Sequence, residues 1–286
     1  MHAVHAIGYK NGAKQPFHVS HMSLSMLPPD TDIAPQARQR TYRTTFAGQP
    51  AWVKLAQDKS FPLAPLFQRA VRTPLMPPVL RCSHIFNRKR ALAFEAGRLR
   101  HLAGRGHNVP HIFDQTSDHL VLSDAGTSIW LALHGSGRAQ RGDLIRKVGE
   151  AMAALHNDEQ FHGQPYPKNL TVDASGAIHF IDLEDDVEKV MGVADAQLRD
   201  IWLLAHGHWP FAKDMPHIGQ RVVNAYVMAS RPGRIRGLAE RLPQVTGLYA
   251  RLVHAGAGPK VADNIRRYQW TAQALKDGFS RQFRVL

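Results

Sequence analysis

Residues 162–169 read His-Gly-Gln-Pro-Tyr-Pro-Lys-Asn, and residues 181–183, which begin twelve positions after Asn169, read Ile-Asp-Leu. Between them, two short apolar runs flank the polar Asp-Ala-Ser-Gly of 173–176, which predicts a tight hairpin. Asn169 at the end of the loop and Asp182 at the end of the second strand would then converge on one ion, although both could merely cap turns. Mg²⁺ prefers hard oxygen ligands shared with phosphate oxygens and water. This stretch therefore predicts a magnesium site that also contacts a phosphate-bearing ligand.

Strands are expected before residue 124 and helices after residue 142. Alternating β-branched and aromatic residues predict a hairpin over 38–56, and two further strands are expected at 109–113 and 119–123. A helix is expected among these strands at 87–105, because apolar residues recur there at helical spacing. The later helices are expected at 143–157, 195–207, 215–230, 234–254 and 258–281.

This order predicts an α+β protein with a small antiparallel sheet followed by a larger helical part. We expect a tail at 1–35, an N-terminal lobe at 36–123, a hinge or connector at 124–142 and a helical C-terminal lobe at 143–286. Ligands often bind in the cleft between two such parts, so the functional site is expected there.

The composition indicates anionic partners. The chain has 286 residues, and 36 Lys and Arg against 23 Asp and Glu give a formal net charge of +13. This excess favours contact with phosphates, nucleic acid or an acidic membrane surface, although an inert basic surface is an alternative. Cys82 is the single cysteine, which excludes an intramolecular disulfide and a cysteine metal cage. We expect a cytoplasmic protein, with peripheral contact at the inner membrane face as one option.

Lys54 is the expected phosphate-binding cation, because it lies in the apolar strand Trp-Val-Lys-Leu at 52–55. Glu95 lies in the middle of the helix that follows and could hold Lys54 toward the phosphates. The alternatives are a solvated lysine at a sheet edge and an ordinary glutamate on a helix surface. Ser123 and Asp124, where the last strand meets the connector, are expected to line the nucleotide site.

Together these residues resemble the protein-kinase-like superfamily, whose loop has His-x-Asp, four residues and Asn ahead of a metal-binding Asp. Among the branches of this superfamily, the chain is similar to the bacterial lipopolysaccharide (Kdo) kinases and to their Bud32-like and aminoglycoside-phosphotransferase-like relatives. Two further segments carry the resemblance: Glu-x-x-x-Leu-x-x-Leu-x-x-x-Gly-x-x-Val-Pro at 95–110 and Asp-Leu-Glu-Asp at 182–185. It spans residues 40–206 and implies a two-lobed fold that uses ATP and Mg²⁺.

The resemblance also implies roles for individual residues. Lys54 would bind the phosphates, and Asn169 and Asp182 would hold the metal. His162 and Asp200 would support the loop, and Asp200 would do so through hydrogen bonds to the loop backbone. A plain alternative for Asp200 is an acid at a helix start, which the helix dipole favours.

Two features depart from the family pattern. Gln164 stands where the catalytic Asp belongs, and Gly48 is a lone glycine where a glycine-rich loop would cover the phosphates. Glutamine can accept a hydrogen bond but cannot hold a proton near neutral pH. Losing a general base costs roughly 10²–10⁴ in rate, yet phosphoryl transfer depends chiefly on positioning and electrostatics. Gln164 would therefore contact the acceptor, with Glu184 or Asp185 as a substitute base.

Several functions remain open. The first is an ATP- and Mg²⁺-dependent phosphotransferase whose hydroxyl acceptor is an anionic small molecule, a lipid or lipopolysaccharide headgroup, or a protein Ser or Thr. The second is a pseudokinase that binds nucleotide and acts as a scaffold. A nucleotidyl transferase is also possible, because the selenoprotein-O-like branch likewise has His-Gly without Asp at this position. A nucleic-acid-binding protein has only the charge in its favour, since no helix-turn-helix, zinc finger or RNA motif is present.

Overall fold

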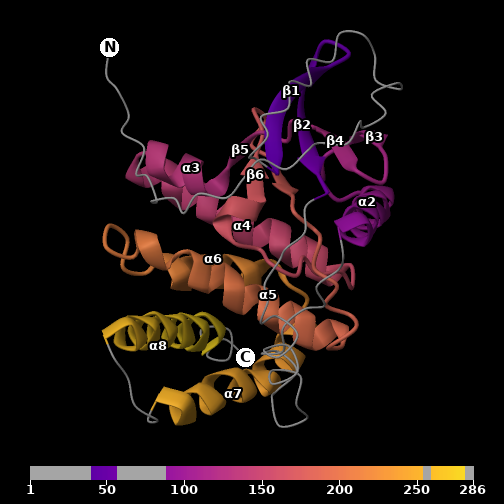
Figure 1. The fold of residues 1–286 in the computed structure, drawn as a ribbon. Helices are drawn as coiled ribbons and strands as arrows, with labels where there is room; N and C mark the ends of the chain where they lie inside the picture. Colours follow the sequence, from indigo (N-terminus) through magenta and orange to yellow (C-terminus); the bar gives the residue numbers. More distant parts are fainter. Residues whose placement is uncertain (1–39, 57–87, 254–258, 281–286) are drawn as a thin grey trace.

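The computed structural model describes residues 40–56, 88–253 and 259–280. Over these residues the chain is an α+β protein with two small antiparallel sheets and seven helices (Figure 1). The fold class expected from the sequence is therefore confirmed at this level. The tail expected at 1–35 lies outside the described residues, and so does Cys82.

The four-stranded sheet comes first in the chain. Its order is β1-β2-β4-β3, all antiparallel, with β1 at Thr41–Phe46, β2 at Gln49–Leu55, β3 at Ile112–Gln115 and β4 at His119–Ser123. The hairpin expected over 38–56 is confirmed. Ala47 and Gly48 form its turn with φ of 48° and 76°, the positive values that the right-handed twist of a tight hairpin favours.

The sheet curls, and its two faces have different partners. Phe46 of β1 and Phe113 of β3 stack with ring centroids 5.3 Å apart, although two strands separate them in the sheet. Under them lies a small apolar cluster of Tyr42, Ala51, Val53 and Val121. Lys54 lies opposite Leu120 in the register and therefore points to the other face. Leu120 belongs to the main core, so Lys54 emerges beside that core rather than at an open edge.

Helix α2 (Arg88–Gly104) covers the face of the sheet that carries Lys54, and it confirms the helix expected at 87–105. The buried stripe of this helix consists of Leu92, Ala96, Leu99 and Leu102. Glu95 follows the same side of the helix and is 1% exposed. The helical period thus brings a carboxylate into the interior, facing the strand that carries the lysine.

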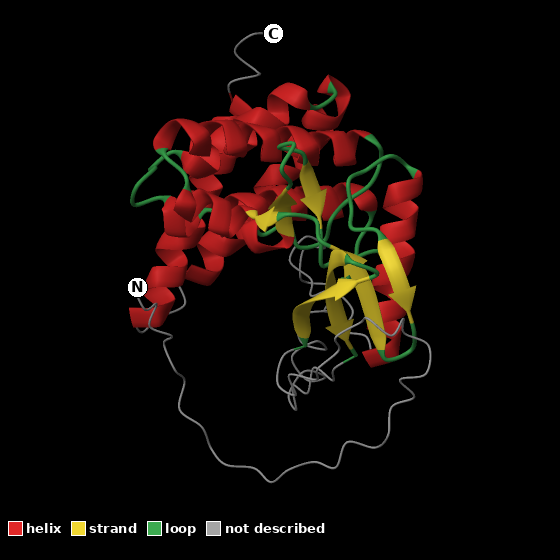
Figure 2. Cartoon of the chain, turned by 90° about the horizontal axis from the view of Figure 1, so that it is seen from above, coloured by secondary structure: helices red, strands yellow, loops and turns green. Residues whose placement is uncertain are grey.

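The remaining helices and the second sheet form the larger part of the molecule. The elements are β5 (Thr127–Ser128), α3 (Ile129–Gly135), α4 (Arg138–Asn157), β6 (Leu170–Val172), β7 (Ile178–Phe180), α5 (Val193–Gly207), α6 (Ile218–Ala229), α7 (Pro232–Val253) and α8 (Pro259–Ser280). Figure 2 shows the four-stranded sheet at one end of the molecule and most helices at the other. None of the helices in the described ranges is long and apolar enough to cross a bilayer.

The segment expected as a connector, 124–142, contains regular structure. It holds β5, α3 and the first turn of α4, which begins at Arg138 instead of residue 143. Ser128 caps α3, because its Oγ accepts a hydrogen bond from Leu131 N at 3.3 Å. β5 pairs with β6, so this segment is joined to the sheet that leads into the Asp182 region.

Helices α4 and α6 approach each other closely at Gly149. A Cβ built there would lie 2.6 Å from Ala225 Cβ and 2.7 Å from the Val222 carbonyl oxygen. We expect Gly149→Ala to lower the free energy of unfolding by about 1–3 kcal/mol, because the methyl group would force the helices apart. This loss opposes the gain of about 1 kcal/mol that alanine normally brings to a helix.

Gly142→Ala is the matched control, since it lies in the same helix and a Cβ there would meet no described atom within 4 Å. This variant should unfold at the same or a higher urea concentration than the parent protein. Urea unfolding followed by circular dichroism measures both. A Gly149→Ala protein as stable as Gly142→Ala would show that the helices do not meet at this position.

Candidate functional site

Lys54 lies at the centre of a charge cluster between the sheet, α2 and the segment after β7. Its Nζ is 2.7 Å from Glu95 Oε2, 2.6 Å from Asp182 Oδ1 and 3.5 Å from Glu184 Oε2. The side chains of Lys54 and Glu95 are 8% and 1% exposed, whereas that of Asp182 is 35% exposed. The structure therefore brings Lys54, Glu95 and Asp182 together and leaves Asp182 as the most accessible of the three.

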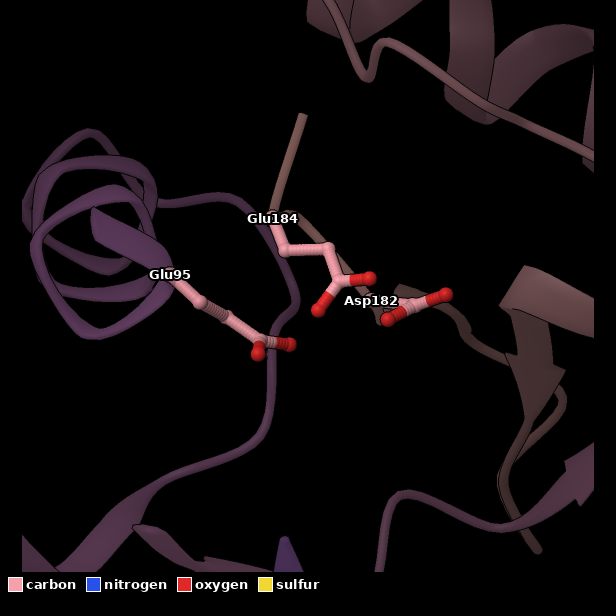
Figure 3. A group of neighbouring side chains, drawn as sticks. All are labelled: Glu95, Asp182 and Glu184. Carbon is pink, nitrogen blue, oxygen red and sulfur yellow. The ribbon is translucent and has the colours of Figure 1, made fainter. Parts of the chain in front are cut away.

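The three carboxylates of this cluster converge from two elements. Figure 3 shows Glu95 on α2 pointing toward Asp182 and Glu184, which lie on the segment after β7. Each offers an oxygen within 4.8 Å of the other two. Such hard oxygen ligands match the preference of Mg²⁺, so the donor set fits this metal. The ammonium group of Lys54 lies among the same oxygens, and a metal would compete with it for them.

The charges of the cluster keep Lys54 protonated. Burial alone would lower the pKa of Lys54, but Glu95, Asp182 and Glu184 outweigh it and raise the pKa above its ordinary value. Arg40, just before β1, supplies a second cation by pairing with both carboxylate oxygens of Glu184. Three carboxyl groups thus face two cations, and burial raises the pKa of Glu95 although Lys54 opposes this effect.

Asp200 holds the backbone of the loop that begins at His162. Its carboxylate accepts hydrogen bonds from His162 N at 2.5 Å and Gly163 N at 2.8 Å. His156 Nε2 lies 3.3 Å from the same carboxylate, and neither side chain is exposed. Asp200 lies in the middle of α5, not at its start, so the alternative of an acid at a helix start does not apply. This fully buried carboxylate positions the loop by accepting from two backbone N–H groups.

His162 joins the two ends of this loop as a neutral imidazole. Burial lowers its pKa, and the opposing effect of Asp200 is smaller. A carbonyl oxygen can only accept, so Nε2 carries the hydrogen in its 3.2 Å contact with the Asn169 carbonyl. Nδ1 is then free to accept from Gln164 N at 3.3 Å. Both contacts therefore fit the His162 tautomer that carries its hydrogen on Nε2.

Asn169 and Asp182 lie on neighbouring segments. The Asn169 carbonyl accepts a hydrogen bond from Ile181 N at 3.1 Å, directly before Asp182. Asn169 Nδ2 donates to the Gln164 carbonyl at 2.9 Å, which leaves its Oδ1 as the atom able to bind a metal. Asp182 has a φ of 61°, a left-handed conformation that costs roughly 1–3 kcal/mol and is often found at functional sites.

Gln164 contacts an acidic residue of the segment after β7. Its Nε2 donates to Asp185 Oδ2 at 2.5 Å. Residue 164, where the resemblance led us to expect an aspartate, therefore carries an amide that lies directly against a neighbouring carboxylate.

Ser123 and Asp124 make local contacts at the end of β4. Ser123 Oγ accepts from His111 N at 2.9 Å. Asp124 pairs with Arg43 at 2.8 Å and accepts from Gly126 N at 2.9 Å. Both side chains thus have structural partners here, and their part in nucleotide binding stays a prediction.

The second half of α2 contacts the residues just before the loop. Arg98 donates to the Phe161 carbonyl, and its guanidinium carbon lies 4.4 Å from the centre of the Phe161 ring. Arg105, in the turn just after α2, forms an ion pair with Asp158. One helix therefore supports both Lys54, through Glu95, and the chain that leads into His162.

Comparison with known proteins adds no family. No family model matches the chain, and no curated protein matches it. The function therefore has to be inferred from the geometry of Lys54, Asp182 and Asp200.

Sequence patterns did not reveal the part that Arg40 and Glu184 play in the Lys54 cluster. Arg40 appears in the sequence only as a residue at the start of a strand, and Glu184 only as a substitute base. The contact joins residues 144 positions apart, so no local pattern signals it. The one available signal was indirect: Glu184 lies two positions after Asp182 in a run of acids, close enough to share its surroundings.

Proposed function

We propose that the chain is an ATP- and Mg²⁺-dependent phosphotransferase with a protein-kinase-like, two-lobed fold that acts on a hydroxyl acceptor. One observation carries the proposal: the buried Lys54–Glu95 ion pair meets Asp182, beside a loop whose backbone Asp200 holds. Phosphoryl transfer requires a cation on the phosphates, oxygen ligands for a divalent metal and a positioned acceptor. The described residues offer a candidate for each.

In this proposal Lys54 binds phosphate oxygens of ATP, and Glu95 keeps the lysine in place. Asp182 and Asn169 Oδ1 hold the metal, so Asp182 gives up its contact with Lys54 when nucleotide enters. A Mg²⁺ ion held by these two residues would supply positive charge to offset the charge that develops on the phosphate oxygens. Asp200 and His162 keep the loop in the conformation that presents Gln164 to the acceptor.

The acceptor class follows from charge. A formal net charge of +13 favours an acceptor that is already anionic, such as a phosphorylated sugar or a lipid headgroup, over a neutral one. A protein Ser or Thr in an acidic segment meets the same condition. Peripheral contact with an anionic membrane surface in the cytoplasm would bring a lipid headgroup to the site.

Gln164 supports a second candidate, a pseudokinase that binds nucleotide without turnover. An amide at this position cannot take a proton from the acceptor. Label transfer separates the candidates: product that carries the γ-phosphate indicates a kinase, product that carries the α-phosphate indicates a nucleotidyl transferase, and no product indicates a scaffold.

Thermal unfolding with nucleotide tests the metal and phosphate site. We expect ATP with Mg²⁺ to raise the melting temperature and ATP with a chelator to leave it unchanged. At about 100 times the dissociation constant, ligand adds about 2.7 kcal/mol of stability. Asp182→Ala and the closer mimic Asp182→Asn should both abolish this shift, each measured from its own baseline, because Asp182 is the proposed metal ligand.

Glu188→Ala is the control for that experiment, since Glu188 is an exposed acid six positions further along the same segment. It should keep the full nucleotide-dependent shift. A shift that survives in both Asp182 variants would rule out Asp182 as the ligand.

A further inference from the structure

Position 164 carries a glutamine where the resemblance implies a catalytic aspartate, but the carboxylate of Asp185 lies next to it in space. Gln164 Nε2 donates to Asp185 Oδ2 at 2.5 Å, across a separation of 21 residues. The two segments also pack together at Gly163, where a Cβ would lie 3.3 Å from Asp185 Cβ and 3.2 Å from Val187 Cγ2. Gly163 has a φ of +100°, which glycine adopts without strain. The loop is thus shaped to bring Asp185 against residue 164.

We propose that Asp185 is the proton acceptor of the transfer reaction and that Gln164 positions it. This inference rests on the proposed phosphotransferase function. The acceptor oxygen forms a bond to the γ-phosphorus while the bond from that phosphorus to the bridging oxygen breaks. ADP leaves with the electron pair, and the hydroxyl proton passes to the Asp185 carboxylate and then to solvent.

The contacts of Asp185 leave one oxygen for this task. Gln164 and Arg199 both approach Oδ2, Arg199 at 3.9 Å. Oδ1 makes no hydrogen bond to any residue within the described ranges. The side chain is 11% exposed, so it is largely enclosed but retains contact with the surface. One oxygen is therefore held by the protein while the other can meet an acceptor hydroxyl.

The two neighbouring acids are less suited to the role. Glu184 is engaged by Arg40 and by Lys54 in the phosphate-binding cluster. Asp186 pairs with Lys189 at 2.9 Å. Among these three consecutive acids, Asp185 is the one that forms a side-chain hydrogen bond with Gln164 within the described residues.

Hydrolysis of MgATP by the full chain, with water as the acceptor, tests the inference. Asp185→Asn should lower kcat at least about 10²-fold, because a general base contributes about 10²–10⁴ in rate. Its KM for MgATP and its stabilisation by MgATP should not change, because Asp185 does not bind the nucleotide in this scheme. Asp186→Asn, which removes a neighbouring buried acid, should keep the parental kcat.

A double variant that exchanges the acid and the amide between positions 164 and 185 separates a proton-transfer role of Asp185 from a structural one. Combining Gln164→Asp with Asp185→Asn returns a carboxylate to the loop and should restore kcat about tenfold over Asp185→Asn alone. A purely structural loss would not be recovered by moving the acid. Parental kcat in Asp185→Asn would overturn the inference, and so would an exchange variant no faster than Asp185→Asn.

The wild-type protein distinguishes this inference from the function on which it depends. A protein that MgATP stabilises but that releases no phosphate overturns the role of Asp185 and leaves nucleotide binding intact. A protein that MgATP does not stabilise overturns the proposed function itself, and the inference falls with it.

Discussion

Replacing Lys54 by methionine should lower the free energy of unfolding by about 3–5 kcal/mol, the cost of leaving a buried charge without its partner. Glu95 is 1% exposed and has Lys54 at 2.7 Å, so it would lose its cation without gaining water. Methionine keeps most of the apolar stem, which limits the loss of packing. The same change should remove stabilisation by MgATP, since it removes the proposed phosphate ligand.

Urea unfolding of the single and double variants measures how strongly Lys54 and Glu95 stabilise each other. The double variant Glu95→Leu, Lys54→Met should lose less free energy of unfolding than Lys54→Met alone, because it no longer buries an unpaired carboxylate. Lys147→Met is the control, since its lysine forms a half-exposed pair with Asp143 and should change stability little. If Lys54→Met were as harmless as Lys147→Met, the cluster would not be a buried charge site.

Asp200→Ala should lower the free energy of unfolding by about 2–6 kcal/mol, because each of two buried donors left without a partner costs about 1–3 kcal/mol. The change would leave the N–H groups of His162 and Gly163 without an acceptor inside the protein. The loop would then lose its conformation, and MgATP turnover should fall even in the folded fraction. Chemical unfolding together with phosphate release measures both effects.

Asp200→Asn gives an intermediate case. It keeps one acceptor oxygen, but its amide N–H₂ would face a donor, so we expect partial losses of stability and turnover. The exposed Asp214→Ala is the control and should behave as the parent protein. Full turnover in Asp200→Ala would mean that the loop holds its shape without this carboxylate.

Local sequence patterns were sufficient to predict the hairpin and the helix that carry Lys54 and Glu95. Alternation over 38–56 predicted the hairpin, and helical spacing predicted α2 with Glu95 on it. The spacing did not fix which side of α2 is buried: Leu92 and Ala96 are buried, whereas the apolar Ala91 and Phe94 are only partly buried. Apolar residues occur on more than one side of this helix, so the period alone does not fix its orientation.

Other features lay beyond local patterns. The first turn of α4 reads Arg-Ala-Gln-Arg and carries no apolar stripe, so the helix could be recognised only from Leu144 onward. The seven-residue α3 is too short for a periodic signal. The contacts of Gln164 with Asp185 and of Arg40 with Glu184 depend on how distant segments pack, which is a property of the tertiary structure.

The attachment of α2 to the chain before His162 limits how the molecule can open. Arg98, in the second half of this helix, contacts Phe161, and Arg105, in the turn just after it, pairs with Asp158, whereas Glu95 lies near the middle of the helix. A rigid-body rotation that separates Glu95 from Lys54 would have to pivot about the fastened end or carry the loop along with it. We therefore expect any such rotation of α2 to be coupled to the position of the loop that begins at His162.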